Sequence, residues 1–123
     1  MEVIVKSLIG IFTIIDGKIY LLMEGNNLFN ITCNDNVELE NQRFIDNNLN
    51  IENLDLKQCY TFSEKEDDKL VISILYSDIV NYNSIKSNNF ILMPIENVNK
   101  DIYINKLIES LKKDLVLNST IKK

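Results

Sequence analysis

Two runs of hydrophobic residues open the chain, and a tight-turn signal separates them. Val3–Ile15 is rich in β-branched side chains, and Lys18–Glu24 reads KIYLLME. Between them lies Asp16-Gly17, a dipeptide that adopts the positive φ angles of a two-residue hairpin turn at little cost. The pattern therefore predicts an antiparallel β-hairpin at the start of the chain.

A helical pattern follows a polar, asparagine-rich stretch, Gly25–Asn36, which we expect to be a loop. Asp35 or Asn36 is expected to cap the start of the helix with its side chain. Asn50 is expected to end the helix in the left-handed conformation more often taken by glycine. The hydrophobic positions that recur at helical spacing are Val37, Phe44, Ile45 and Leu49.

The second half of the chain predicts three strands and a second helix. The acidic stretch Ser63–Lys69 is expected to be a turn, and the long apolar run Leu70–Val80 a central, buried strand. Ile102–Val116 carries hydrophobic residues at helical spacing and charged residues on its other face. The remaining predicted strands are Leu56–Phe62 and Phe90–Met93, the second ended by Pro94.

The order of these elements favours an α/β (α+β) fold in which a mixed sheet lies between two helices. Strands and helices interleave without βαβ regularity, and layers of this kind bury the hydrophobic faces of all elements. A length of 123 residues is enough for one modest core. We therefore expect a single domain, residues 1–123, with the architecture of an α/β/α sandwich.

The charge distribution argues against direct nucleic-acid binding. The net charge is −5, the lysines are scattered, and Arg43 is the single arginine. A protein that binds phosphates along a nucleic acid needs a basic face. The first residues lack a basic leader, and the apolar stretch after them is too short and interrupted to span a bilayer. We expect a cytoplasmic protein with no membrane contact.

The chain contains no histidine and two cysteines, Cys33 and Cys59. Two reduced thiols are expected in or near the core, because a zinc site normally needs more Cys or His ligands. The usual general base at neutral pH is also missing.

The predicted fold resembles the Nudix fold, and the likeness becomes specific at residues 29–51. The Nudix box has the form G-x5-E-x7-R-E-U-x-E-E-x-G-U, where U is a bulky aliphatic residue. With Arg43 at the box arginine, Ile45 and Ile51 satisfy the two aliphatic positions and Asn50 stands at the second glycine. The other aligned residues are Phe29 at the first glycine, Asp35 at the first glutamate, and Phe44, Asn47 and Asn48 at the three helix glutamates.

The missing glutamates change what the resemblance implies about chemistry. In the Nudix family these side chains share one helix face and hold Mg²⁺ or Mn²⁺, which polarise a diphosphate and activate water. Phe44, Asn47 and Asn48 supply no negative charge. The resemblance therefore implies a Nudix-like domain without catalytic residues, a metal site or another cofactor.

The second half of the chain resembles one branch of the family. Residues 58–80, QCYTFSEKEDDKLVISILYSDIV, are similar to the Q-x-Y-T-F…R-x-I-S-V-x-Y-x-x-L-V segment of ADP-ribose pyrophosphatases and of Nudix-related transcriptional regulators of NAD metabolism. Residues 90–117 resemble the end of that domain, with Tyr103 near the family's histidine. We expect no counterpart of the winged helix of those regulators within residues 1–123. Because the regulators are dimers, the resemblance implies a homodimer.

The residues expected to bind a ligand are Arg43, Asn47, Tyr60 and Phe62. The resemblance implies a nucleotide or ADP-ribose-like ligand, with the aromatic rings available to stack on a base. Tyr76 and Phe90 are further aromatic residues that could line such a pocket. Against this, Arg43 could be a helix-surface arginine, and aromatic residues on strands are more often part of the core.

Three functions follow from these features. The first is a non-catalytic Nudix-like module that senses a nucleotide-type ligand or binds a partner protein in a regulatory role. The second is a divergent metal-dependent hydrolase of nucleoside diphosphate derivatives with relocated carboxylates. The third is an assembly role, with homodimers formed through the hairpin or an exposed sheet edge. Helix-dipole compensation for Glu38 and Glu40, and a solvated turn for the acidic stretch, are the favoured explanations of these carboxylates. The carboxylates open to the second function are Asp35, Glu38, Glu40, Glu64, Glu66, Asp67 and Asp68.

Overall fold

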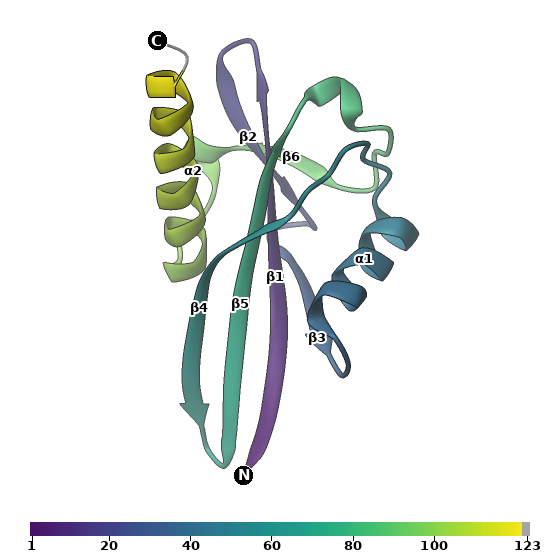
Figure 1. Cartoon of the computed structure of the whole chain (residues 1–123), viewed down its shortest axis with the longest axis vertical. Helices are drawn as coiled ribbons and strands as arrows, with labels where there is room; N and C mark the ends of the chain where they lie inside the picture. The colour runs from purple at the N-terminus through teal and green to yellow at the C-terminus, as the bar shows by residue number, and fades with distance from the viewer. Residues whose placement is uncertain (122–123) are drawn as a thin grey trace.

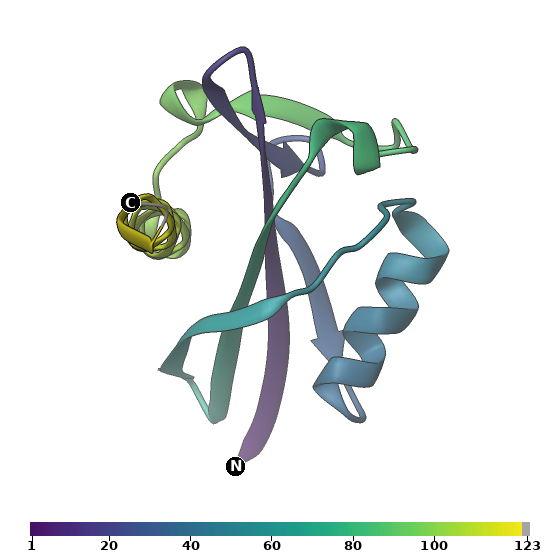
Figure 2. The same ribbon diagram turned by 45° about the horizontal axis from the view of Figure 1, so that its top comes forward.

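A six-stranded mixed sheet with one helix on each face forms the structure (Figures 1 and 2). The computed structural model describes the backbone of residues 1–121 and the side chains of residues 1–116. Helix α1 (Val37–Asn48) packs on one face, and helix α2 (Ile102–Ile121) on the other. The predicted α/β/α sandwich with a mixed sheet is therefore confirmed. Neither helix of the described chain is long and apolar enough to cross a membrane.

Strand β1 organises the sheet because it contacts three other strands. All of it but the last two residues pairs in parallel with β5, from Glu2 opposite Lys69 to Thr13 opposite Val80. On its other side, the first half of β1 pairs with β3 and the second half with β2, both antiparallel. Strand β4 lies outside β5, and β6 outside β2. The strands are β1 (Glu2–Ile15), β2 (Lys18–Met23), β3 (Phe29–Cys33), β4 (Lys57–Glu66), β5 (Lys69–Val80) and β6 (Ile91–Pro94).

The predicted hairpin is confirmed with its turn. Asp16 and Gly17 have φ angles of 50° and 78°, the positive values expected of a two-residue hairpin turn. Ile15 then lies opposite Lys18, so the hydrophobic residues of both strands point to matching faces.

Two loop predictions are wrong. Residues 25–36 are not all loop, because Phe29–Cys33 forms β3 and buries Phe29 and Cys33 against β1. The turn in the acidic stretch Ser63–Lys69 is also shorter than predicted. Strand β4 continues to Glu66, and the chain reverses at Asp67 and Asp68, with Asp67 at φ 54°. In both places, pairing with a neighbouring strand outweighs a polar local composition.

Helix α1 begins as predicted but ends differently. The Asn36 side chain caps it by accepting a hydrogen bond from the Leu39 N–H at 3.0 Å. At the other end, Leu49 has an extended backbone with φ −120°, and Asn50 is not left-handed. Extended backbone sends residues two apart to the same side, so Leu49 and Ile51 are both buried. The left-handed residue of this connection is Asn53, at φ 61°.

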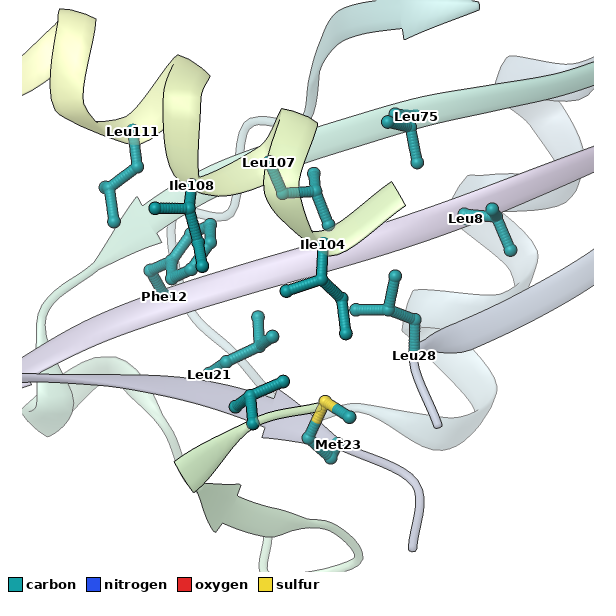
Figure 3. Packing of buried hydrophobic residues seen from close by; sticks show 11 residues of the cluster. Leu8, Phe12, Leu21, Met23, Leu28, Leu75, Ile104, Leu107, Ile108 and Leu111 are labelled. Carbon is teal, nitrogen blue, oxygen red and sulfur yellow. The ribbon is translucent and has the colours of Figure 1, made fainter. Parts of the chain in front are cut away.

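The sheet separates two hydrophobic clusters. On the α2 face, Leu107 packs directly over Gly10 of β1, where a Cβ atom would come within 2.7 Å of its Cδ1. Figure 3 shows the helix side chains pointing toward Leu8, Phe12 and Leu21 of the sheet. The α1 face holds a second cluster that includes Ile9, Ile11, Leu22, Phe29, Ile45 and Leu49. Both cysteines are free, Cys33 buried and Cys59 half-buried, as the sequence predicts.

Candidate functional site

The four residues predicted to bind a ligand do not form one site. Arg43 and Asn47 lie one turn apart on α1 with exposed side chains, on the α1 side of the sheet. Phe62 packs into the core cluster of the opposite face, and its ring lies 5.0 Å from that of Tyr103 on α2. The Tyr60 ring contacts the Phe62 ring in a tilted arrangement, with the ring centroids 4.8 Å apart. Whether either pair contacts a ligand remains a prediction.

The wider set of aromatic residues is divided in the same way. Tyr60 belongs with α2, because the Lys106 Nζ lies 4.5 Å from the centroid of its ring. Phe90 contacts Phe29 on the α1 face, and Tyr76 lines a cleft beside α1. A shared aromatic pocket of Tyr60, Phe62, Tyr76 and Phe90 is therefore wrong.

Aromatic packing occupies the flank of α1 that faces β3. The Phe44 ring lies 5.7 Å from that of Phe29, which in turn lies 6.5 Å from Phe90. In the sequence alignment with the Nudix box, Phe44 stands at a helix glutamate and Phe29 at the first glycine. One turn later, the Asn48 Nδ2 donates to the backbone carbonyl of Phe44 at 3.1 Å. This flank therefore carries phenyl rings and the Asn48 amide, which is already hydrogen-bonded, where the box has carboxylates.

The carboxylates of the first turn have a structural role. The Glu40 Oε2 accepts hydrogen bonds from the backbone N–H groups of Asn34 and Asp35, at 2.8 and 3.3 Å. These bonds hold the loop between β3 and α1. Within the described part of the chain, no three His, Cys, Asp or Glu side chains come together in a way that could hold a metal ion.

A cleft lies along the other flank of α1, above β5 and β4. We call it the α1–β5 cleft, and its volume is about 320 Å³. Glu38 and Gln42 form its helix wall because they are one turn apart, i and i+4. Its full lining is Glu38, Asn41, Gln42 and Ile45 from α1, Leu54, Asp55 and Leu56 from the connection to β4, Gln58 from β4 and Tyr76 from β5.

Two polar side chains of this cleft are largely buried, yet each has a polar atom without a protein partner among residues 1–116. Asn41 is 4% exposed, and its Oδ1 accepts a hydrogen bond from the Ser7 Oγ at 2.6 Å. Its amide nitrogen has no hydrogen-bond partner among residues 1–116. Tyr76 is 7% exposed, and its hydroxyl also lacks a partner within the same residues. Among the described residues, the buried side-chain atom without a partner is the Thr13 Oγ1, so the polar atoms of Asn41 and Tyr76 keep contact with solvent. Because both residues line the cleft, these two atoms are candidates for contact with a ligand.

The electrostatic surroundings keep the tyrosine protonated. Burial raises the pKa of Tyr76, and the nearby Glu38 carboxylate and Cys33 add to this effect. Burial and the Glu40 carboxylate likewise raise the pKa of the Cys33 thiol. At neutral pH the Tyr76 hydroxyl is therefore a neutral donor and acceptor, and Cys33 is not an activated nucleophile.

Sequence reasoning missed Asn41 and gave Tyr76 only a general role. A signal for Asn41 was present, because it lies four residues before Ile45 and so falls within the hydrophobic stripe of α1. A polar residue at such a position must find a buried partner. The partner, Ser7, lies 34 residues away, beyond the reach of helical periodicity.

Two further cavities lie on the α2 face. One, of about 420 Å³, contains Cys59, whose pKa is raised chiefly by burial. The other, of about 450 Å³, lies at the start of α2 and includes Glu64, Asp101 and Tyr103. The Tyr103 hydroxyl donates to the Glu64 Oε1 at 3.4 Å, so its polar group is already used.

No family model matches the sequence, and no protein with a curated description matches it. The fold, however, is similar to solved structures. The Nudix domain of Shewanella oneidensis NrtR, complexed with ADP-ribose, is 14% identical with a TM-score of 0.65, covering 94% of this chain and 89% of that one. In a second structure of Shewanella oneidensis NrtR, which is 15% identical with a TM-score of 0.64, the match covers 90% of this chain and 62% of that one.

Two further solved structures are also similar in fold. The Ap4A hydrolase of C. elegans is 15% identical with a TM-score of 0.65, covering 92% of this chain and 98% of that one. A MutT/Nudix family protein from Listeria innocua is 10% identical with a TM-score of 0.66, covering 94% and 97%. Together with the sheet order and the two helix layers, these similarities show that this chain is a Nudix-like domain in its fold.

Proposed function

We propose that this Nudix-like domain is a non-catalytic binding module. It binds a nucleotide-type ligand, or a partner protein, without hydrolysing a diphosphate. The observation that carries the proposal is the packing of Phe44 against Phe29, at 5.7 Å, where the box alignment expects a metal-binding glutamate.

The chemistry of the metals supports this proposal. Mg²⁺ gives up its water ligands reluctantly and favours anionic oxygen ligands. A phenyl ring offers none, Asn47 is neutral, and the Asn48 amide is engaged with the backbone carbonyl of Phe44. The helix face that would orient the metals is therefore uncharged at all three positions.

The ligand part of the proposal rests on analogy of fold. The NrtR Nudix domain has been solved with ADP-ribose, which makes a nucleotide-type ligand the first class to test here. One fold supports many functions, so the analogy selects a test and does not replace it. A regulatory role through a second copy of the chain or another cytoplasmic protein belongs to the same proposal.

The test combines a hydrolysis assay with a binding measurement. Purified protein is incubated with ADP-ribose or Ap4A and Mg²⁺ or Mn²⁺, and the products are separated by chromatography. We expect no turnover above a protein-free control, with a catalytically competent Nudix hydrolase as positive control. Calorimetry is expected to give saturable heat with at least one member of a panel of adenosine, AMP and ADP-ribose.

Metal-dependent turnover by the purified protein would contradict the proposal and favour a divergent hydrolase. The observation that favours this second function is the presence of two carboxylates, Glu38 and Asp55, in the α1–β5 cleft. A hydrolase of this kind would lose turnover on Glu38→Gln while its thermal unfolding stayed unchanged. Glu40→Gln would be less informative, because Glu40 also holds the preceding loop.

A further inference from the structure

We propose that the α1–β5 cleft binds the nucleoside class of ligand, a base with its sugar and without phosphate, through the Tyr76 hydroxyl and the Asn41 amide. This inference rests on the proposed ligand-binding function and names its site and ligand class. The site lies on the flank of α1 opposite Phe44, away from the positions aligned with the Nudix box glutamates.

The first argument is a pair of polar groups that line the cleft and have no hydrogen-bond partner among residues 1–116. Asn41 and Tyr76 are both more than nine-tenths buried, and both line the same cleft. The Ser7 hydroxyl donates to the carbonyl oxygen of the Asn41 side chain, which leaves the amide nitrogen available as a donor to a ligand. Neither the Asn41 amide nitrogen nor the Tyr76 hydroxyl is among the buried side-chain atoms without a partner, so both polar atoms keep contact with solvent. A ligand whose acceptors replace that water can therefore bond to both groups.

The second argument is the shape and lining of the cleft. A volume of about 320 Å³ lies at the lower end of the range of ligand pockets, roughly 300–1,000 Å³. Ile45, Leu54 and Leu56 supply an apolar surface for a flat ring, and Tyr76 adds an aromatic one. Around them stand polar groups that can define the orientation of a ligand, as in most small-molecule sites.

The amides of the cleft suit a base edge. The Nε2 atoms of Gln42 and Gln58 are held by Asp46 and Thr61, each at 2.9 Å, so both side chains have a defined orientation. Amide side chains pair with the adjacent donor and acceptor of adenine in protein–nucleic acid contacts. The same chemistry applies to a free nucleoside.

The third argument is the negative charge of the cleft lining, which favours an uncharged nucleoside over a negatively charged nucleotide. Glu38 and Asp55 are the charged residues of the lining, and none of the nine lining residues is basic. Carboxylates accept hydrogen bonds from sugar hydroxyls, as they do in dinucleotide sites. A phosphate would instead face like charges at short range without a compensating cation. The cleft therefore favours an uncharged ligand.

Calorimetry with adenosine, AMP and ADP-ribose tests the inference. We expect adenosine to bind and AMP to bind more weakly. Tyr76→Phe removes the hydroxyl but keeps the ring, and is expected to weaken adenosine binding about tenfold. Tyr82→Phe, an exposed tyrosine outside the cleft lining, is the matched control and should leave the affinity unchanged.

A charge variant tests the third argument separately. Glu38 is exposed at the rim of the helix wall, so Glu38→Gln is expected to fold normally. Removing this carboxylate should narrow the difference in affinity between adenosine and AMP. Thermal unfolding of each variant checks that the fold is intact.

The outcomes separate the inference from the proposed function. If AMP or ADP-ribose binds more tightly than adenosine and Tyr76→Phe has no effect, the inference is overturned while the ligand-binding function stands. If none of the three compounds binds, both the nucleotide-type ligand and the nucleoside cleft are overturned, and the interaction with a partner protein remains. Adenosine binding that Tyr76→Phe weakens and Tyr82→Phe does not supports the inference.

Discussion

At the scale of single residues, two buried hydroxyls on one face of β1 differ in whether they form a hydrogen bond. Ser7 and Thr13 are both 0% exposed and both lie at odd positions of the strand. The Ser7 hydroxyl donates to Asn41, whereas the Thr13 Oγ1 is the buried side-chain atom that lacks a partner among the described residues. Strand periodicity predicts the burial of both residues but not which of them is satisfied.

We expect Thr13→Val to raise the free energy of unfolding by about 1 kcal/mol, because it replaces an unsatisfied hydroxyl with a methyl group of similar size. Ser7→Ala should lower it by about 1–2 kcal/mol, because it leaves the Asn41 carbonyl oxygen buried without a donor. Chemical denaturation of the two variants beside the parent protein measures both effects. Equal destabilisation by the two changes would show that Thr13 also has a partner.

At the scale of elements, the sequence predicts most of the pieces because their signals are local. Asp16-Gly17 encodes the hairpin, and Asn36 encodes the start of α1 within three residues. Strand β3 has no such signal, because only Phe29 and Cys33 of its five residues are buried and asparagines surround it. It becomes a strand because β2 pairs with the second half of β1 and leaves the first half open.

The contact between α2 and β1 depends on the absence of a side chain at Gly10. A Cβ atom there would lie 2.7 Å from the Leu107 Cδ1, and Leu107 is 0% exposed, so its side chain has little room to move. We expect Gly10→Ala to lower the free energy of unfolding by about 1–3 kcal/mol, as overpacking usually does.

Leu107→Ala provides the matching test, measured by the same denaturation experiment. It removes the atoms that the new methyl group would meet, so the double variant should lose less stability than the sum of the two single variants. Strictly additive losses would show that Gly10→Ala acts through the backbone of β1 and not through the helix contact.

At the scale of the whole molecule, the connection from α1 to β4 crosses the sheet and is held at Asp78 of β5 (Figure 1). The two carboxylate oxygens of Asp78 accept from the backbone N–H groups of Asp55, at 2.9 Å, and of Ile79, at 2.8 Å. Burial raises the pKa of Asp78 nevertheless, and Asp55 adds to the rise, while the two backbone donors and Lys57 oppose it. The folded protein therefore holds a proton on Asp78 more tightly than the unfolded chain does.

The sign of the pH dependence follows from this linkage. The stability that Asp78 contributes is fully present below the pKa of the unfolded chain and is lost as the pH rises through the higher pKa of the folded protein. Asp78→Asn cannot ionise, so the free energy of unfolding of this variant lacks the pH dependence that Asp78 contributes. The variant also loses one of the two backbone hydrogen bonds, because an amide nitrogen cannot accept. The free energy of unfolding of the parent minus that of the variant should therefore fall as the pH rises above about 4.

Denaturation curves of parent and variant from about pH 3 to about pH 7 measure this difference, in which the titration of the other carboxylates cancels. A difference that stays constant, or grows with pH, would show that the two backbone donors outweigh the cost of burying Asp78.

The amino-acid sequence by itself determined the features whose physical cause is local. These are the turn at Asp16-Gly17, a helix cap at Asp35 or Asn36, the hydrophobic stripes of both helices, and the uncharged side chains at the positions aligned with the three helix glutamates of the box. The tertiary structure decided which surfaces meet. It placed Arg43 and Tyr60 on opposite sides of the sheet, and it brought Asn41 to the same cleft as Tyr76. Hydrophobic periodicity predicts which face of a helix or strand is buried. The element that this face packs against depends on strand order and on contacts between residues far apart in the chain.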